Sequence, residues 1–251
     1  MRRFIGLCLV LWCLFCVGWP TLAQTLLGFP PGMFDGRAVL DAASGGGTVL
    51  FDAVASAFVV DSGTTTTLSW THTPVGTPTK AAVAFENYDT NCTVSGVTYG
   101  GVSMVQEASQ TISAGGSSVQ IWALANPSAG AQTVVITCGQ HMYTQAGSIT
   151  VTGGSTVTAI RAANTALATS TTPSVSVTSA TGDFIVDVVG STGANVTTTA
   201  GGSQNKRWGP TDAGTNTASS STLPAGSGST TMTWTLGSSV TWGQAAVSLH
   251  N

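Results

Sequence analysis

Charge is scarce in this chain of 251 residues, because Asp, Glu, Lys and Arg together make up only 7%. Ordinary soluble proteins carry about a quarter. No basic stripe is present, so nucleic acid and anionic membrane surfaces are not expected partners. A Gly-x-Ser-x-Gly elbow and a phosphate-binding loop with its Lys-Ser/Thr pair are also missing. The sequence therefore contains no local signature of a serine hydrolase or of a nucleotide-binding protein.

The first 23 residues predict the compartment. Arg2 and Arg3 precede an apolar run from Phe4 to Trp19, and small residues ending at Ala23 follow. These are the three parts of a secretory signal peptide, and the run is shorter than the roughly 20 residues that a spanning helix needs. We expect a mature chain from Gln24 that is secreted or held in the cell envelope, without membrane insertion. Five basic against ten acidic residues give this mature chain a net charge of −5.

Cysteine is also rare in the mature part, which keeps only Cys92 and Cys138. Two cysteines in an oxidising compartment predict one disulfide. A zinc site would need four ligands at recognisable spacing, so no metal site is expected from this pair. No cofactor is expected either.

Short apolar stretches divided by Gly, Ser, Thr and Pro predict an all-β chain. Residues 24–47 are interpreted as a lead-in segment or linker, and 48–251 as a single domain, a two-sheet antiparallel β-sandwich of jelly-roll-like type.

No segment has a helical period over three turns; 159–169 is interpreted as a loop or one short helix. Residues 190–228 are expected to form long surface loops around one or two weak strands. No sequence repeat is strong enough to indicate two tandem copies. The expected strands are 48–53, 57–61, 65–72, 80–86, 96–99, 102–107, 118–124, 132–138, 147–152, 155–161, 174–178, 183–189, 229–236 and 240–249.

Alternation of apolar and polar residues selects the candidate core. The expected buried set is Trp122, Phe184, Val186, Trp234 and Leu236. Two turns are also predicted: Gly100-Gly101 as a two-residue hairpin of type I′ or II′, and residues 126–130 as a longer hairpin loop.

Eight strand and turn motifs follow one another along roughly 48–249. They are Phe51-Asp52-Ala53, Leu68–His72, Val97–Met104, Ile121–Pro127 with Gly130 and Thr133–Thr137, Gly182–Asp187, Arg207-Trp208, Met232–Leu236 and Trp242–Leu249. Taken together, they resemble a diffuse group of secreted bacterial and phage-associated β-sandwich domains of uncharacterised function. The resemblance implies a fold and transfers no functional residue.

Few side chains suggest a binding site. Trp208 lies in a loop-like context, where an exposed indole could stack on a sugar or anchor a partner. The predicted disulfide would bring a polar and aromatic cluster together, although a stapled structural loop is the simpler interpretation. The candidate binding residues are Trp208, Tyr88, Tyr143, His141, Glu86 and Asp89.

Carboxylates offer the other candidate chemistry. Glu86 and Asp89 are the closest acidic pair, which glycoside hydrolysis or a calcium site could use, although a solvated loop is the simpler interpretation. Asp183 and Asp187 lie four apart on an expected strand and are interpreted as solvated. Asn91 and Asn195 begin N-glycosylation sequons, which matter only in a host that glycosylates.

The sequence thus favours a secreted, non-enzymatic structural or adhesive module at the cell surface or in an extracellular assembly. Self-association and surface glycan are the expected kinds of partner. A carbohydrate-binding module is one alternative and would need an exposed aromatic platform. A hydrolase using Glu86 and Asp89 is another.

Overall fold

The structure is a computed structural model that describes residues 47–60, 63–88, 92–113, 116–192, 195–209 and 217–251. The expected signal peptide and almost all of the lead-in segment lie outside these residues. All described residues belong to one compact unit, Ser44–Asn251. Its strands are β1 (Leu50–Val60), β2 (Thr67–His72), β3 (Lys80–Asn87), β4 (Val94–Tyr99), β5 (Val102–Ser103), β6 (Val105–Thr111), β7 (Ser118–Ala125), β8 (Gln132–Cys138), β9 (Tyr143–Thr152), β10 (Ile160–Ser170), β11 (Ser174–Ser179), β12 (Phe184–Ser191), β13 (Thr198–Ala200), β14 (Asn205–Trp208), β15 (Thr217–Pro224), β16 (Gly228–Leu236) and β17 (Val240–Leu249).

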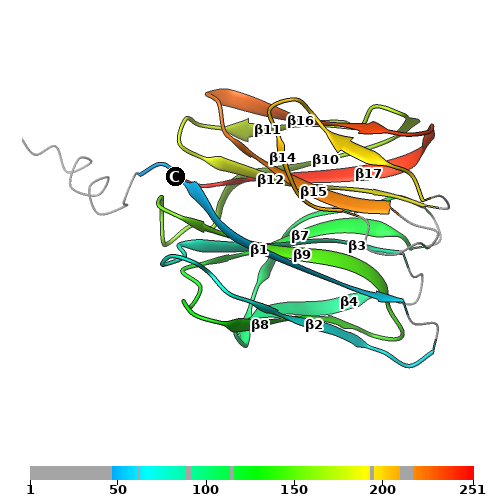
Figure 1. Ribbon diagram of the computed structural model, residues 1–251, viewed down its shortest axis with the longest axis horizontal. Coiled ribbons are helices and arrows are strands. Elements are labelled where there is room, and N and C mark those ends of the chain that lie inside the picture. Colours follow the sequence, from blue (N-terminus) through cyan, green and yellow to red (C-terminus); the bar gives the residue numbers. More distant parts are fainter. Residues whose placement is uncertain (1–46, 61–62, 89–91, 114–115, 193–194, 210–216) are drawn as a thin grey trace, which may run out of the picture. The chain divides into compact units, whose positions relative to one another are not determined.

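These strands form four antiparallel sheets in four layers (Figure 1). The N-terminal half has an inner sheet β1-β9-β3-β7-β6 and an outer sheet β2-β8-β4-β5. Strand β5 belongs to the outer sheet and β6 to the inner sheet, and only the buried Met104 separates them, so the chain passes directly from one sheet to the other. The order β1-β9-β3-β7 against β2-β8-β4-β5 is that of a jelly roll. The expected all-β, antiparallel, jelly-roll-like sandwich is therefore confirmed, but the described chain has four sheets where two were expected.

The C-terminal half repeats this topology, which the sequence did not reveal. Its inner sheet is β10-β17-β12-β15-β14 and its outer sheet is β11-β16-β13. Every strand of the C-terminal half therefore has a counterpart in the N-terminal half, from β10 with β1 to β17 with β9, whereas β5 has none among the described residues. Even a β-bulge recurs, because the register of β1 skips Asp52 and that of β10 skips Arg161. The described chain contains two jelly rolls in tandem.

The two inner sheets pack face to face. Strand β12 lies against β3 and β7, β15 against β3 and β9, and β6 against β10 and β17. An apolar core fills this interface, with Ile121 and Ile149 from one sheet and Val186 and Val247 from the other. Because the central strands are covered on both faces, they are buried along their whole length. Separate apolar cores lie between the inner and outer sheet of each jelly roll.

Several local predictions are confirmed. Phe184, Val186, Trp234 and Leu236 are buried, and Trp122 is half-buried. Gly100 and Gly101 both have positive φ, as a type I′ hairpin turn requires. A disulfide links Cys92 and Cys138, whose Cα atoms lie 4.9 Å apart.

Three local expectations are wrong. The stretch 159–169 is neither loop nor helix, because β10 occupies it as an edge strand. Within 190–228, strand β15 is almost entirely buried; its serines and threonines bond to neighbouring strands, so their polarity did not keep it at the surface. The 126–130 loop joins strands of two different sheets and is no hairpin.

Candidate functional site

The two tyrosines of the expected cluster are in contact. Tyr88 directly follows β3, and Tyr143 begins the neighbouring β9. The backbone N–H of Tyr88 donates to the carbonyl oxygen of Tyr143 at 2.9 Å. Their rings meet edge to face, with centroids 5.7 Å apart. Both side chains are partly exposed, so they form an aromatic pair at the end of the inner N-terminal sheet.

The disulfide holds this end of the sheet together. Asn87, which precedes Tyr88, donates from Nδ2 to the carbonyl oxygen of Cys92 at 3.1 Å. The Thr144 hydroxyl donates to Asn87 Oδ1 at 3.2 Å. His141 is partly buried in the same connection between β8 and β9. The segment around the tyrosine pair is therefore anchored by one covalent bond and by side-chain hydrogen bonds.

Glu86 does not join the tyrosines at the surface. Its side chain is 1% exposed and faces the C-terminal jelly roll, with the Ser117 hydroxyl donating to Oε1 at 3.5 Å. Gly190 on β12 leaves space for this side chain, because a Cβ atom there would lie 3.0 Å from Glu86 Cγ and Cδ. Substrate in solution cannot reach a carboxylate enclosed in this way. Asp89, its expected partner, lies outside the described residues.

Trp208 is not exposed in a loop. It ends strand β14, is 7% exposed and belongs to the core between the two jelly rolls. Its indole lies over β9 at Gly147, where any Cβ atom would collide with the ring. The adjacent Arg207 guanidinium stacks 3.5 Å from the centroid of the Phe51 ring on β1. Trp208 and Arg207 thus join the two jelly rolls, and the buried indole of Trp208 offers no platform for a ligand.

Two exposed apolar residues that the sequence did not single out extend the tyrosine pair. Val60 on β1 pairs directly with Tyr143, and Phe58 pairs with Gln145 two residues further along β9. Directly paired residues point to the same face of a sheet. Phe58 is 47% exposed and Val60 is 51% exposed. We call Phe58, Val60, Tyr88 and Tyr143 the aromatic patch.

The sequence could not separate the patch from the core. Both alternating sets along β1 are apolar, with Val54, Phe58 and Val60 on one face and Ala55, Ala57 and Val59 on the other. Only the folded structure shows which of these two sets of β1 side chains is exposed to solvent.

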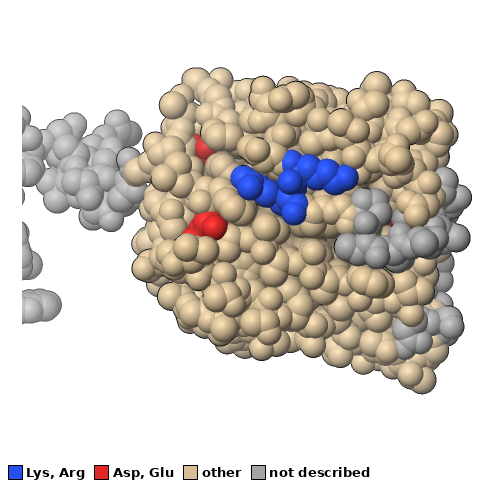
Figure 2. All heavy atoms as spheres, in the orientation of Figure 1, with Lys and Arg blue, Asp and Glu red and all other residues tan. Residues whose placement is uncertain are grey.

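Charge is sparse on the face that β1 crosses. Figure 2 shows this face as almost entirely uncharged, apart from two small acidic areas and a basic cluster over β14. Strand β14 carries Lys206 and Arg207, both of which bond within the fold. Lys206 Nζ donates to the Thr198 hydroxyl at 2.8 Å, and Arg207 Nε donates to the Thr222 hydroxyl at 2.7 Å.

A buried network in the N-terminal jelly roll has the residue types of a catalytic site but no access. His72 Nδ1 lies 2.7 Å from the Ser148 hydroxyl, and Nε2 lies 3.0 Å from the Thr150 hydroxyl. Thr150 donates in turn to Asp52 Oδ2 at 2.8 Å. Burial lowers the pKa of His72, although the charge of Asp52 opposes this. Because His72, Ser148 and Thr150 are fully buried, the network stabilises the fold and cannot meet a substrate.

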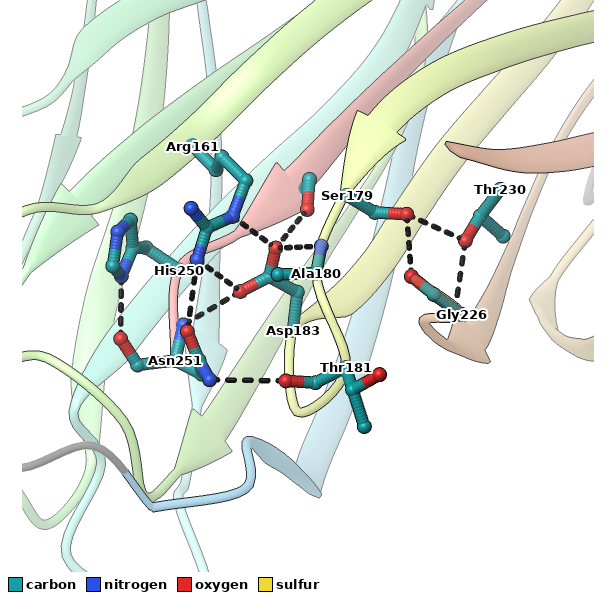
Figure 3. Close-up of polar contacts among 10 residues, drawn as sticks. Arg161, Ser179, Ala180, Thr181, Asp183, Gly226, Thr230, His250 and Asn251 are labelled. Atoms are coloured by element: carbon teal, nitrogen blue, oxygen red, sulfur yellow. Dashed lines mark hydrogen bonds and ion pairs between the residues drawn. The ribbon is translucent and has the colours of Figure 1, made fainter. Parts of the chain in front are cut away.

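The expectation that Asp183 and Asp187 are solvated is wrong, because both are buried. Asp183 forms a two-point ion pair with Arg161, at 2.5 and 3.2 Å (Figure 3). It also accepts from the Ala180 and Asn251 backbone N–H groups at 2.9 Å. Burial would raise the pKa of Asp183, but the Arg161 bond and the other donors outweigh it, so the pKa is lowered. The cluster fastens the 180–183 turn and residue 251 to β10.

Asp187 lies inside the core of the C-terminal jelly roll. It accepts from the backbone and hydroxyl of Ser221, from Trp234 Nε1 at 2.7 Å and from Gln244 Nε2 at 2.8 Å. Burial raises the pKa of Asp187 to about 6, although these donors favour the ionised form. Four donors converging on one carboxylate describe a structural centre that joins β12, β15, β16 and β17.

Comparisons with known proteins found no match among protein-family models, curated proteins or solved structures. Among the described residues, no group of three or more His, Cys, Asp or Glu is placed to hold a metal ion. Nor does the described part contain a helix with the length and apolar character needed to cross a membrane.

Proposed function

We propose that the chain is a secreted, non-enzymatic structural or adhesive module built from two stacked jelly rolls. The observation that carries this proposal is the aromatic patch, in which the exposed Phe58 and Val60 adjoin the partly exposed Tyr88 and Tyr143 on a surface with little charge. Adjacent apolar side chains at the surface commonly mark contact sites with other macromolecules.

The use of the ionisable groups supports the non-enzymatic part of the proposal. Glu86, Asp183 and Asp187 are buried, and His72 is enclosed among hydroxyl groups. Catalysis needs titratable groups that can reach a substrate. In the described chain these groups serve to hold sheets together. The hydrolase alternative loses its support because Glu86 is enclosed by Gly190 and Ser117.

Localisation outside the cytoplasm rests on two features. The N-terminal 23 residues have the organisation of a signal peptide. The Cys92–Cys138 disulfide is compatible with an oxidising compartment.

A carbohydrate-binding module remains the second candidate, because tyrosine rings beside polar groups can stack on sugar rings. The site would be Tyr88 and Tyr143 rather than the buried Trp208. A glycan array distinguishes the two functions: binding to one glycan class, lost in Tyr143→Ala and kept in Tyr143→Phe, would favour the carbohydrate-binding candidate.

The direct test is attachment. The purified mature protein is incubated with intact cells of the organism that encodes it, and the bound fraction is measured after washing. We expect retention without turnover of glycoside, ester or peptide substrates, and a clear loss of retention in Phe58→Ser/Tyr143→Ser. Val75→Ser, which changes an exposed valine outside the patch, is the control. Reproducible hydrolysis, or attachment that the double substitution leaves unchanged, would overturn the proposal.

A further inference from the structure

Strand β1 is a long edge strand with an open side. It spans Leu50–Val60, and β9 is its single hydrogen-bonded neighbour in the described part of the chain. Residues 53–60, with the sequence AVASAFVV, contain no charged residue and no proline. Natural edge strands are usually protected by charge, proline or short length, because unpaired backbone groups recruit further strands.

The equivalent strand of the C-terminal jelly roll is protected. On β10 the Asn164 side chain accepts from the Thr165 backbone N–H at 2.9 Å and donates to the Ser176 carbonyl oxygen at 2.8 Å. Both strands carry one charged residue at the bulge near their start, Arg161 on β10 and Asp52 on β1. The two strands therefore differ at Asn164, which caps a backbone N–H of β10, whereas residues 53–60 of β1 contain no amide or charged side chain.

The sequence of β1 is complementary to itself. In an antiparallel pair centred on Ser56, Val54 lies opposite Phe58 of the second copy, and Ala55 lies opposite Ala57. Ala53 then meets Val59, so every pair from 53 to 59 outside the central Ser56 pair is apolar. Directly opposed like charges would destabilise such a pair, and none arises within this span.

We propose that the open edge of β1 pairs antiparallel with β1 of a second copy of this chain. The sheet β1-β9-β3-β7-β6 of one copy then joins the same sheet of the second copy, and the two form one continuous sheet across a twofold axis at Ser56. Because the same surface is used by both copies, the contact closes at the dimer. The inference deepens the proposed structural function, on which it rests, by naming one partner.

Substitution at the axis tests the pairing. Ser56 is exposed, and Ser56→Lys would place two ammonium groups directly opposite each other. Sedimentation velocity of the mature chain over a concentration series should show a monomer–dimer equilibrium, weakened by about tenfold or more in Ser56→Lys. Ala163→Lys adds the same charge at an exposed position of β10 and should leave the equilibrium unchanged.

Cross-linking tests the register independently of affinity. Ser56→Cys should form a disulfide-linked dimer under mild oxidation, since the two Cβ atoms face each other at the axis. Ala163→Cys should remain monomeric under the same conditions.

A chain that sediments as a monomer at its highest soluble concentration overturns the pairing, as does association that Ser56→Lys leaves unchanged. Cell attachment that survives either result leaves the proposed function standing. A dimer that fails to attach to cells would instead contradict the adhesive function alone.

Discussion

Gly147 on β9 lies against the indole of Trp208 on β14, and this contact joins the two jelly rolls. A Cβ atom at Gly147 would collide with Nε1 and Cδ1 of the ring. A glycine in one half therefore makes room for a tryptophan from the other. The close approach shows that the inner sheets pack as one core, and that Trp208 has a structural role.

Gly147→Ala should destabilise the protein by overpacking this contact. The neighbouring ring is wide and buried, so it cannot move without displacing β14. We expect a loss of about 1–3 kcal/mol in the free energy of unfolding, measured by urea denaturation. Gly96→Ala is the control, because no heavy atom lies within 4 Å of the added Cβ. Equal effects of the two substitutions would contradict the packing role of Trp208.

Lys80→Met should stabilise the protein at pH 7. Lys80 is fully buried, its Nζ has no hydrogen-bond partner among the described residues, and burial lowers its pKa to about 8 despite the charge of Asp183. The topologically equivalent residue in the C-terminal jelly roll is Phe184, so the position accepts an apolar side chain. We expect a gain of about 1–3 kcal/mol by urea denaturation.

The pH dependence and a matched lysine make the Lys80 result specific. A pKa lowered from 10.5 means that the penalty is complete below about pH 8 and disappears as the pH rises towards 10.5. The gain from Lys80→Met should shrink over that range. Lys206→Met removes a lysine that donates two hydrogen bonds to Thr198, so it should destabilise instead. A destabilised Lys80→Met variant would show that its ammonium group has a compensating partner.

Removal of the disulfide should cost about 4 kcal/mol, the chain-entropy value for cysteines separated by 46 residues. The comparison is between the oxidised protein and Cys92→Ala/Cys138→Ala in urea denaturation. Mass spectrometry should show the native protein two hydrogens lighter than its reduced form. Alkylation of both cysteines without prior reduction would contradict the bond.

The sequence predicted the elements with clear alternation and failed where a property depends on neighbours. Trp234 and Leu236 alternate with threonines, so their burial could be predicted. Ser221 could not be assigned to a buried strand, because its hydroxyl is satisfied by Asp187, 34 residues away. Phe58 was equally hidden, since both faces of β1 are apolar and only sheet order shows that β1 is an edge.

The tandem repeat was invisible for a related reason. Equivalent positions on β3 and β12 hold Lys80 and Phe184, or Val83 and Asp187. The two jelly rolls conserve strand order and a bulge but use different residues. Topology depends on the pattern of burial, which tolerates such exchanges when each core satisfies its own polar groups.

Asp187→Asn should change how stability depends on pH. Burial raises the pKa of Asp187 to about 6 from 3.8, so the folded state holds this proton more tightly than the unfolded chain. The corresponding stability is complete below about pH 4 and is lost as the pH rises through about 6. From this group alone the loss is about 3 kcal/mol. Urea denaturation at pH 3.5 and pH 7 should show that the advantage of the native protein over Asp187→Asn shrinks by that amount.

Asp183→Asn supplies a control of opposite sign. The Arg161 ion pair and the backbone donors lower the pKa of Asp183 despite its burial, so its contribution is present above the unfolded pKa and is lost as the pH falls. The advantage of the native protein over Asp183→Asn should therefore grow between pH 3.5 and pH 7. Opposite trends from two aspartates four residues apart on one chain segment cannot come from a general effect of net charge. Parallel trends would show that the four donors around Asp187, including Trp234 and Gln244, outweigh its burial and keep the carboxylate ionised.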